Sequence, residues 1–181
     1  MTDHVSCLER LEYLGDGTHT LGQVRALVPR CALFSNLSPA EAGLLAPYLD
    51  VYRCEPGTRI MAEGGAGEFL LIILEGRVET SGQEYGSGRP VVAEHGPGAL
   101  LGESALIDGE PHAGACLAID PSLIAVLHRE SLARIIVEQP TLGAKVLMEL
   151  LAVFSARLRA TRDRLRALLD AQALVAGEAR R

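Results

Sequence analysis

The sequence predicts a mainly β domain with flanking helices, followed by one long C-terminal helix. Two patterns support this. Between residues 51 and 127, short β-rich runs alternate with turns that contain Gly or Pro, a spacing typical of a barrel, roll or sandwich. After His128, apolar residues recur at helical intervals. A chain of 181 residues has room for one ordinary domain with an appendage.

Seven strands are expected in the β-rich part, each bounded by turn residues. They are 51–54, 59–61, 69–74, 77–80, 90–95, 113–118 and 123–127. This frequency of turns excludes a parallel sheet with crossover helices.

A capping box predicts a helix ahead of the strands. Ser38 stands at the N-cap position, Pro39 at the first helical position and Glu41 at the third. The helix is expected to continue to about Leu49. Residues 1–30 have short apolar clusters and are expected to be an appendage, so that 31–140 form the β domain and 141–181 the C-terminal helix and tail.

The C-terminal helix is expected over 141–176 and carries an apolar seam. Its members recur in alternating steps of four and three residues: Leu147, Leu151, Phe154, Leu158, Thr161, Leu165, Leu168, Gln172 and Val175. Such spacing is typical of a two-stranded coiled coil and predicts a parallel homodimer through 147–175. The alternative is that the stripe packs on its own domain. Length favours the dimer, because the helix spans about 50 Å and a roll of this size cannot cover it.

Composition and termini exclude several classes of protein. No apolar stretch reaches the roughly 18 residues that a membrane span needs, and the N-terminus lacks an export signal. We therefore expect no membrane segment and a cytoplasmic location. The net charge of −6 argues against binding nucleic acid over the whole surface. No CxxC pair is present, so the four cysteines are expected to be reduced thiols without a metal site.

No catalytic motif is found. The GxSxG, HExxH and GxxxxGK patterns are absent, and the five histidines are scattered singly. The sequence therefore predicts that the protein is not an enzyme, and it names no catalytic residue.

The most informative stretch is Leu-Gly-Glu-Ser-Ala-Leu-Ile-Asp-Gly-Glu-Pro-His-Ala at residues 101–113. It resembles the phosphate-binding cassette of the cyclic-nucleotide-binding domain family, which includes bacterial catabolite activators, regulatory subunits of cyclic-AMP-dependent kinases and gated channels. The resemblance covers about residues 31–170. It also includes Phe34, Leu37, Pro56-Gly57, Glu63-Gly64, Leu74-Glu75-Gly76 and Pro97-Gly98.

The resemblance implies a β-roll, also described as a double-stranded β-helix or jelly roll, with a long dimerisation helix. It implies a stand-alone regulatory sensor whose ligand is cyclic AMP, cyclic GMP or a related phosphorylated molecule. Signalling would pass through the dimer helix to a protein partner. No other cofactor is predicted.

The cassette also has a physical logic of its own. Residues 103–106 can form one helical turn whose free N–H groups, at Ser104 and Ala105, point at an anion. The Glu103 carboxylate offers acceptors to a ribose hydroxyl, and Gly102 lets the backbone approach the ligand. The predicted ligand contacts are Gly102, Glu103, Ser104, Ala105, His112 and Ala113.

The chain departs from the family pattern at His112, where the family has Arg. A neutral imidazole has one donor and no net charge. Loss of a paired, desolvated Arg costs on the order of 3–5 kcal/mol, roughly a hundredfold to several-thousandfold in affinity. Weak binding of cyclic nucleotide is therefore predicted. The alternative is a ligand-free protein-interaction module, for which His112 records the loss of binding.

Three further sets of residues leave alternatives open. By resemblance, Thr161 would contact the purine from across the dimer; as a polar residue in the seam it could instead set the helix register. Relatives that sense haem use His or Cys ligands, which would point to His95, His112 or Cys54, although each is more simply a loop or core residue. The arginines of the helix suit a soluble flank better than DNA, since no helix-turn-helix can follow within the few residues after Ala176.

Overall fold

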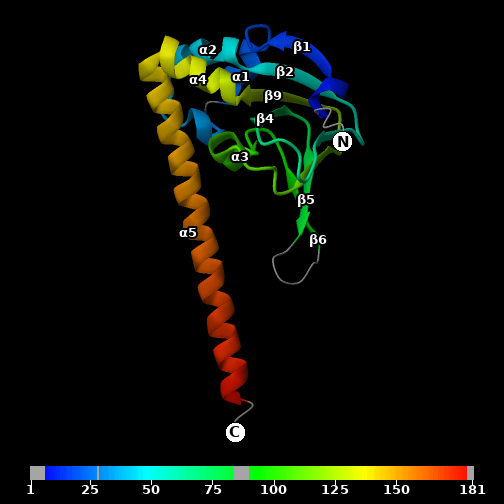
Figure 1. Ribbon diagram of the computed structural model, residues 1–181, viewed down its shortest axis with the longest axis vertical. Helices are drawn as coiled ribbons and strands as arrows, with labels where there is room; N and C mark the ends of the chain where they lie inside the picture. The colour runs from blue at the N-terminus through cyan, green and yellow to red at the C-terminus, as the bar shows by residue number, and fades with distance from the viewer. Residues whose placement is uncertain (1–6, 28, 84–89, 179–181) are drawn as a thin grey trace.

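Two antiparallel sheets form the body of the molecule (Figure 1). The computed structural model describes residues 7–27, 29–83 and 90–178, with the backbone alone for residues 83, 90 and 171–178. One sheet has the order β1 (Glu12–Asp16), β2 (Asp50–Cys54), β9 (Ser122–His128), β4 (Phe69–Glu75) and β7 (Leu100–Leu101). The other has the order β3 (Arg59–Met61), β8 (Ala115–Ala118), β5 (Val78–Gln83) and β6 (Pro90–His95). The predicted mainly β fold is confirmed.

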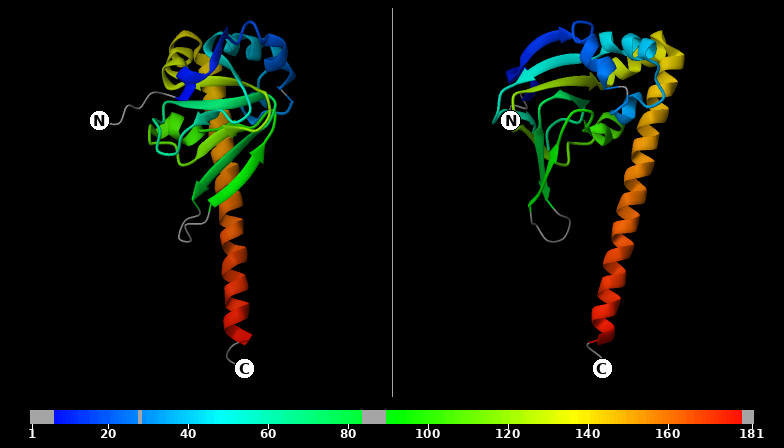
Figure 2. Two further views of the ribbon diagram at one scale, coloured as in Figure 1. Left: turned by 90° about the vertical axis from the view of Figure 1, so that its right-hand side faces the viewer. Right: turned by 180° about the vertical axis from the view of Figure 1, so that it is seen from behind.

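Helices pack on one face of the first sheet, and α5 alone then extends far away from it (Figures 1 and 2). They are α1 (Leu21–Ala26), α2 (Pro39–Leu45), α3 (Glu103–Asp108), α4 (Arg129–Glu138) and α5 (Pro140–Glu178). Short 3₁₀ turns lie at η1 (Cys7–Arg10), η2 (Ala32–Phe34) and η3 (Ala46–Tyr48). Among the described helices, α5 has the same position and nearly the same bounds as the helix predicted over 141–176.

Strand β4 is buried on both of its faces. Successive side chains of a strand point to opposite faces, so Phe69, Leu71 and Ile73 enter a core between the two sheets. Leu70, Ile72 and Leu74 enter a second core beneath the helices. Strand β9 divides its side chains in the same way, with Ile124 and Val126 in the first core. The uninterrupted apolar run of β4 is therefore explained, because the strand pair β4–β9 lies between the two cores and each face of it needs apolar side chains.

The capping box forms as predicted. The Ser38 hydroxyl accepts a hydrogen bond from the Glu41 amide at 3.2 Å, and the Glu41 carboxylate accepts one from the Ser38 amide at 2.9 Å. The Glu41 side chain also pairs with Lys145 on α5 at 2.6 Å, and these contacts lower its pKa to about 2. Helix α2 ends at Leu45, short of the predicted Leu49, and η3 follows. Pro47 lacks the N–H that an α-helix would need there.

All seven predicted strands are present; 59–61 and 90–95 have the predicted bounds, and the other five have shifted ends. The strand expected at 77–80 begins at Val78 and continues to Gln83, and the strand expected at 113–118 shortens to Ala115–Ala118. Strand β7 was not predicted, because two residues show no period. Strand β1 and helix α1 lie within residues 1–30, for which the sequence indicated no element; β1 pairs with β2 through a bulge between Tyr13 and Gly15.

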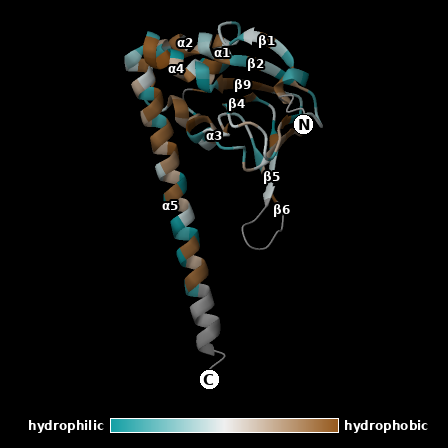
Figure 3. Ribbon diagram, in the orientation of Figure 1, coloured by the Kyte–Doolittle hydropathy of each residue, from teal (hydrophilic) through white to brown (hydrophobic). Residues whose placement is uncertain are grey.

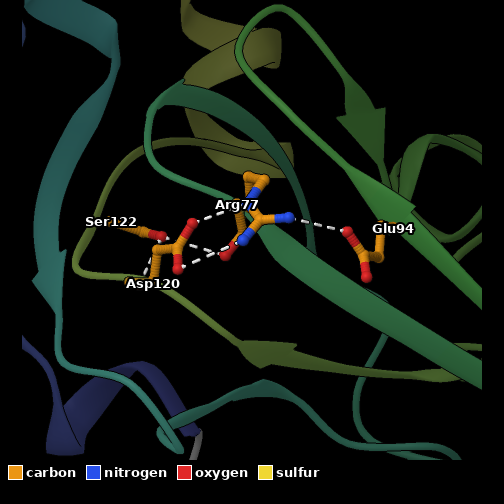
Figure 4. Close-up of polar contacts among 4 residues, drawn as sticks. All are labelled: Arg77, Glu94, Asp120 and Ser122. Carbon is orange, nitrogen blue, oxygen red and sulfur yellow. Dashed lines mark hydrogen bonds and ion pairs between the residues drawn. The ribbon is translucent and has the colours of Figure 1, made fainter.

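The β5–β6 hairpin projects from the roll and is tied at its base by Arg77 (Figures 2 and 4). The Arg77 guanidinium pairs with Asp120 at 2.7 Å and with Glu94 at 3.0 Å. Its carbonyl oxygen accepts a hydrogen bond from the Ser122 hydroxyl at 3.2 Å. Exposed ion pairs add little to stability, so their effect is to hold the start of β5, the end of β6 and the β8–β9 turn in one arrangement.

Helix α5 packs on the roll with its first half only. Val146, Leu150 and Val153 are buried in the core beneath the helices. Residues 158–170 are all exposed, and Figure 3 shows apolar residues recurring along this free part. The helix is about 58 Å long. Among the described helices, none is long and apolar enough to cross a membrane.

The predicted seam falls into two classes. Leu147 and Phe154 are partly buried against their own core, as the alternative interpretation expects. Four other seam leucines are more than half exposed and lack such packing: Leu151, Leu158, Leu165 and Leu168. The side chains of Gln172 and Val175 lie outside the described residues. The distal seam is thus an apolar face that the described part of this chain leaves uncovered.

The shared strand pair predicts where truncation is costly. Val126→Ala removes two methyl groups from a fully buried position and should lower the free energy of unfolding by about 2 kcal/mol. Val92→Ala, the same change at a position that is 54% exposed on β6, should cost at most about 1 kcal/mol. Urea unfolding of both variants measures this. Equal losses would contradict the assignment of Val126 to the core.

Candidate ligand-binding site

A cavity of about 370 Å³ lies between the cassette, the second sheet and α5. All six residues predicted as ligand contacts line it: Gly102, Glu103, Ser104, Ala105, His112 and Ala113. The other lining residues are Met61, Thr80, Leu101, Asp108, Glu110, Pro111, Gly114, Ala115 and Arg157. The structure therefore brings the predicted residues together, and their contact with a ligand stays a prediction.

Gly102 sets the entry to the cassette. Its φ of 79° lies in the left-handed region that favours glycine. A Cβ at this position would lie 3.0 Å from the Phe69 carbonyl oxygen and 3.1 Å from the His112 ring. Helix α3 then starts at Glu103 and ends at Asp108, and Gly109, with a φ of 75°, is its C-cap. The turn predicted over 103–106 is thus two residues longer, since Gly109 is the next residue suited to a left-handed cap.

His112 is held in place by backbone and ring contacts. Its carbonyl oxygen accepts from the Gly64 amide at 2.8 Å, and its amide donates to the Gly65 carbonyl at 2.9 Å. The imidazole stands edge-on to Phe69, with ring centroids 4.8 Å apart. The residue is only 4% exposed, and burial lowers the pKa of His112, so the ring is neutral near pH 7. Its Nε2 atom is buried without a hydrogen-bond partner in the described structure.

Glu103 and Arg157 form an ion pair at the cavity. Glu103 is 3% exposed, and its Oε1 atom pairs with the Arg157 guanidinium. The same guanidinium donates to the Leu100 carbonyl oxygen at 2.9 Å. The second carboxylate oxygen of Glu103, Oε2, is buried and has no partner among the described residues. Helix α5 is thereby attached to Glu103 of the cassette and to Leu100 of β7 just before it.

The charges of the lining are unequal. The described lining residues carry three carboxylates, those of Glu103, Asp108 and Glu110, and one guanidinium, that of Arg157. The positive charge of Arg157 also reaches His95, whose pKa is lowered first by partial burial and then by this arginine. Arg157 is thus the one permanent cation that the described lining offers to an anionic ligand.

Comparison with known proteins places this geometry in a family. The cyclic nucleotide-binding domain family model matches residues 52–139. The solved structure of a cyclic nucleotide-binding domain from Methylobacillus flagellatus is 34% identical, with a TM-score of 0.74, and the match covers 85% of this chain and 86% of that chain. This chain belongs to the cyclic-nucleotide-binding domain family.

Two longer relatives in the family are also similar. The Cyclic AMP receptor protein of Thermus thermophilus is 33% identical over 104 residues, which are 57% of this chain and 48% of that protein. The solved Catabolite Activator Protein of the same organism is 28% identical with a TM-score of 0.68, covering 76% of this chain and 62% of that chain. The chain thus spans about half to three-fifths of these relatives.

Arg157 was missed as a site residue, although the sequence placed it on the flank of the seam. It lies 54 positions after Glu103, and only the packing of α5 brings the two together. Thr80 on β5 also lines the cavity without a sequence signal. Thr161, the proposed purine contact, is exposed and does not line the cavity of its own chain.

The residues weighed as haem ligands are separated. Of the three, His112 alone lines the cavity. The His95 ring lies 2.8 Å from the Thr80 hydroxyl. Cys54 is buried in the core between the sheets, where burial raises the pKa of its thiol to about 12. A protonated, buried thiol is a poor metal ligand.

The cassette geometry predicts a contrast between two glycines. Gly102→Ala should lower the free energy of unfolding by about 1–3 kcal/mol, because a Cβ there is strained and meets Phe69 and His112. Gly57 has a similar φ of 82° but no atom within 4 Å of an added Cβ. Gly57→Ala therefore isolates the backbone strain. If both variants unfold at the same denaturant concentration, the close approach at Gly102 carries no cost.

Proposed function

We propose that this protein is a regulatory sensor domain that binds a small phosphorylated ligand, with weak affinity for cyclic AMP or cyclic GMP. One observation carries the proposal. Two polar atoms, Glu103 Oε2 and His112 Nε2, are buried without a partner among the described residues, and both belong to residues that line the same cavity. A buried polar group without a partner costs about 1–3 kcal/mol. A ligand that supplies both partners would recover that free energy.

The chemistry of the two atoms indicates what such a ligand presents. A carboxylate oxygen only accepts, so Glu103 calls for a donor such as a ribose hydroxyl. A neutral imidazole can donate from Nε2, which suits a phosphate oxygen. The amides of Ser104 and Ala105 lie in the first turn of α3, and both residues line the same cavity. A cyclic nucleotide carries both the hydroxyl and the phosphate, and membership of the family supports this class of ligand.

Weak affinity follows from the charge at the cavity. Burial keeps His112 neutral, so it gives a hydrogen bond but no charge to the phosphate. Arg157 provides a charge, but Glu103 already neutralises it. We therefore expect a phosphate to gain less here than in a relative with a buried arginine.

The path from the ligand to a partner would run through α5. Arg157 joins the cavity to this helix, and four exposed leucines follow the same helix away from the roll. We propose that this distal seam pairs with a second copy in parallel, with Thr161 at its polar position, and that a protein partner reads the dimer. Ligand binding shifts such an equilibrium only if the two states differ in affinity. The proposed role is regulatory rather than catalytic, in the cytoplasm.

One observation favours a second candidate function. The Arg157 guanidinium occupies an oxygen of Glu103 from within the chain, as a ligand hydroxyl would. A ligand-free interaction module needs no more than this, with α5 fixed permanently against the cassette. Titration with ligand distinguishes the two candidates.

The first test is the substitution at His112. Wild-type protein should bind cyclic AMP weakly or not at all at pH 7.5, and His112→Arg should raise the affinity at least about tenfold by adding a buried charge beside the phosphate. Isothermal titration with cyclic AMP, cyclic GMP and cyclic dinucleotides measures both. His19→Arg adds the same charge at an exposed histidine and should change nothing. Micromolar binding by wild type, or no gain in His112→Arg, would contradict the role of this position.

The second test is the pH dependence of wild-type binding. A bound phosphate raises the pKa of His112, whereas burial in the free protein lowers it. Affinity should therefore rise as pH falls through the bound pKa and level off below the free pKa. Titrations between about pH 8 and 6 should show this rise in wild type and in His95→Gln, and none in His112→Arg. A wild-type affinity that does not change with pH would contradict contact between His112 and the phosphate.

The dimer has a separate test. Leu158→Glu with Leu165→Glu places charge in the exposed seam and should yield a monomer in sedimentation or light scattering. Ala160→Glu with Ala167→Glu adds the same charges to exposed positions on the opposite face of α5 and should leave the dimer intact. An unchanged mass of the leucine variant would contradict dimerisation through the seam.

A further inference from the structure

Two arginines of α5 face each other in the proposed dimer. The steps of the seam place Leu151, Leu158 and Leu165 at position a of a heptad. Arg157 is then at position g, and Arg162 is at position e of the next heptad. In a parallel, in-register pair, g of one helix lies beside the following e of the other. Each Arg157 therefore meets Arg162 of the second copy, and two such like-charged contacts oppose pairing.

The structure shows how one of these charges is reduced. Arg157 joins α5 to Glu103 of the cassette and to the Leu100 carbonyl just before the cassette. Its side chain remains 54% exposed while the Glu103 carboxylate beside it is 3% exposed. The guanidinium of Arg157 is thus accessible to a second helix, whereas the Glu103 carboxylate is not. Arg162 is 55% exposed and is bonded to its neighbour Asp163 at 3.0 Å.

We propose that Arg157 couples the charge of the cavity to the affinity of the dimer. Glu103 draws the guanidinium toward the cavity and offsets its charge, so that Arg162 of the second copy meets a weakened repulsion. A bound anion at the cavity adds to this effect, and loss of the Glu103 charge removes it. The inference rests on the proposed parallel dimer and names the contact through which the cavity regulates it.

The size of the effect follows from exposed charge pairs. Each pair contributes modestly and is screened by salt, but the symmetry of the dimer applies every change twice. Glu103→Gln should raise the dimer dissociation constant about threefold to tenfold at low ionic strength. At about 0.5 M salt, where the screening length is a few ångströms, the effect should largely disappear.

The experiment is a double-mutant cycle on the dimer dissociation constant, measured by sedimentation on the full chain. Wild type, Glu103→Gln, Arg162→Ala and the double variant are compared at about 0.02 M and about 0.5 M salt. Arg159→Ala, which removes an arginine from position b away from the contact, replaces Arg162→Ala in the control cycle. Glu103→Gln should weaken the dimer in the wild-type and Arg159→Ala backgrounds and leave it unchanged in the Arg162→Ala background.

Each other outcome overturns the inference, and the outcomes are distinguishable. Equal weakening by Glu103→Gln in the Arg162→Ala background would mean that the carboxylate acts only by holding the cassette together. A dimer constant that Glu103→Gln does not alter would remove the coupling and leave the proposed dimer standing. Wild-type protein that stays monomeric at low and high salt would overturn the proposed dimer as well.

Discussion

The pairing of β4 with β9 is the contact on which the rest of the molecule depends. Each strand divides its side chains between the two cores, so the sheets and the helical layer share these strands. The cassette follows β7, which pairs with β4. Helix α4 follows β9 directly, and its first amide, of Arg129, donates to the Glu68 carbonyl at 2.8 Å just before β4. Because His128 pairs with Phe69 and Gly102 lies beside the Phe69 carbonyl, the cassette and the C-terminal helices both start at the same end of this strand pair.

The cavity combines a backbone held by several contacts with two buried polar atoms that lack hydrogen-bond partners in the described structure. The positions of Glu103 and His112 are fixed by Gly102, by the hydrogen bonds of His112 with the Gly64 amide and the Gly65 carbonyl, and by the ring of Phe69. Oε2 of Glu103 and Nε2 of His112 nevertheless have no hydrogen-bond partner in the described structure. Buried polar groups normally have partners. Their persistence here, beside a single ion pair to α5, is the physical basis for expecting a ligand and for expecting the helix to respond to it.

Local patterns predicted most of the fold, and distant packing accounts for what they missed. The seven strands and the capping box at Ser38 follow from turn residues and side chains within a few positions, and so does the cassette. Arg157 reaches Glu103 only because α4 and α5 fold back across the roll, which no local spacing encodes. Strand β1 carries Gly15 and a bulge, so it lacks the alternation of a strand. The seam period could not show that Leu147 and Phe154 pack on their own core while Leu158 stays exposed.

The length of α5 turns small movements at the cavity into large ones elsewhere. Beyond Arg157 the helix continues to Glu178, a distance of about 30 Å. If the helix tilts by about 10° about its packed end, its tip moves by about 5 Å. By its length alone, the helix would amplify any tilt at its packed end. A partner that grips its far end would detect a rearrangement too small to reshape the roll itself.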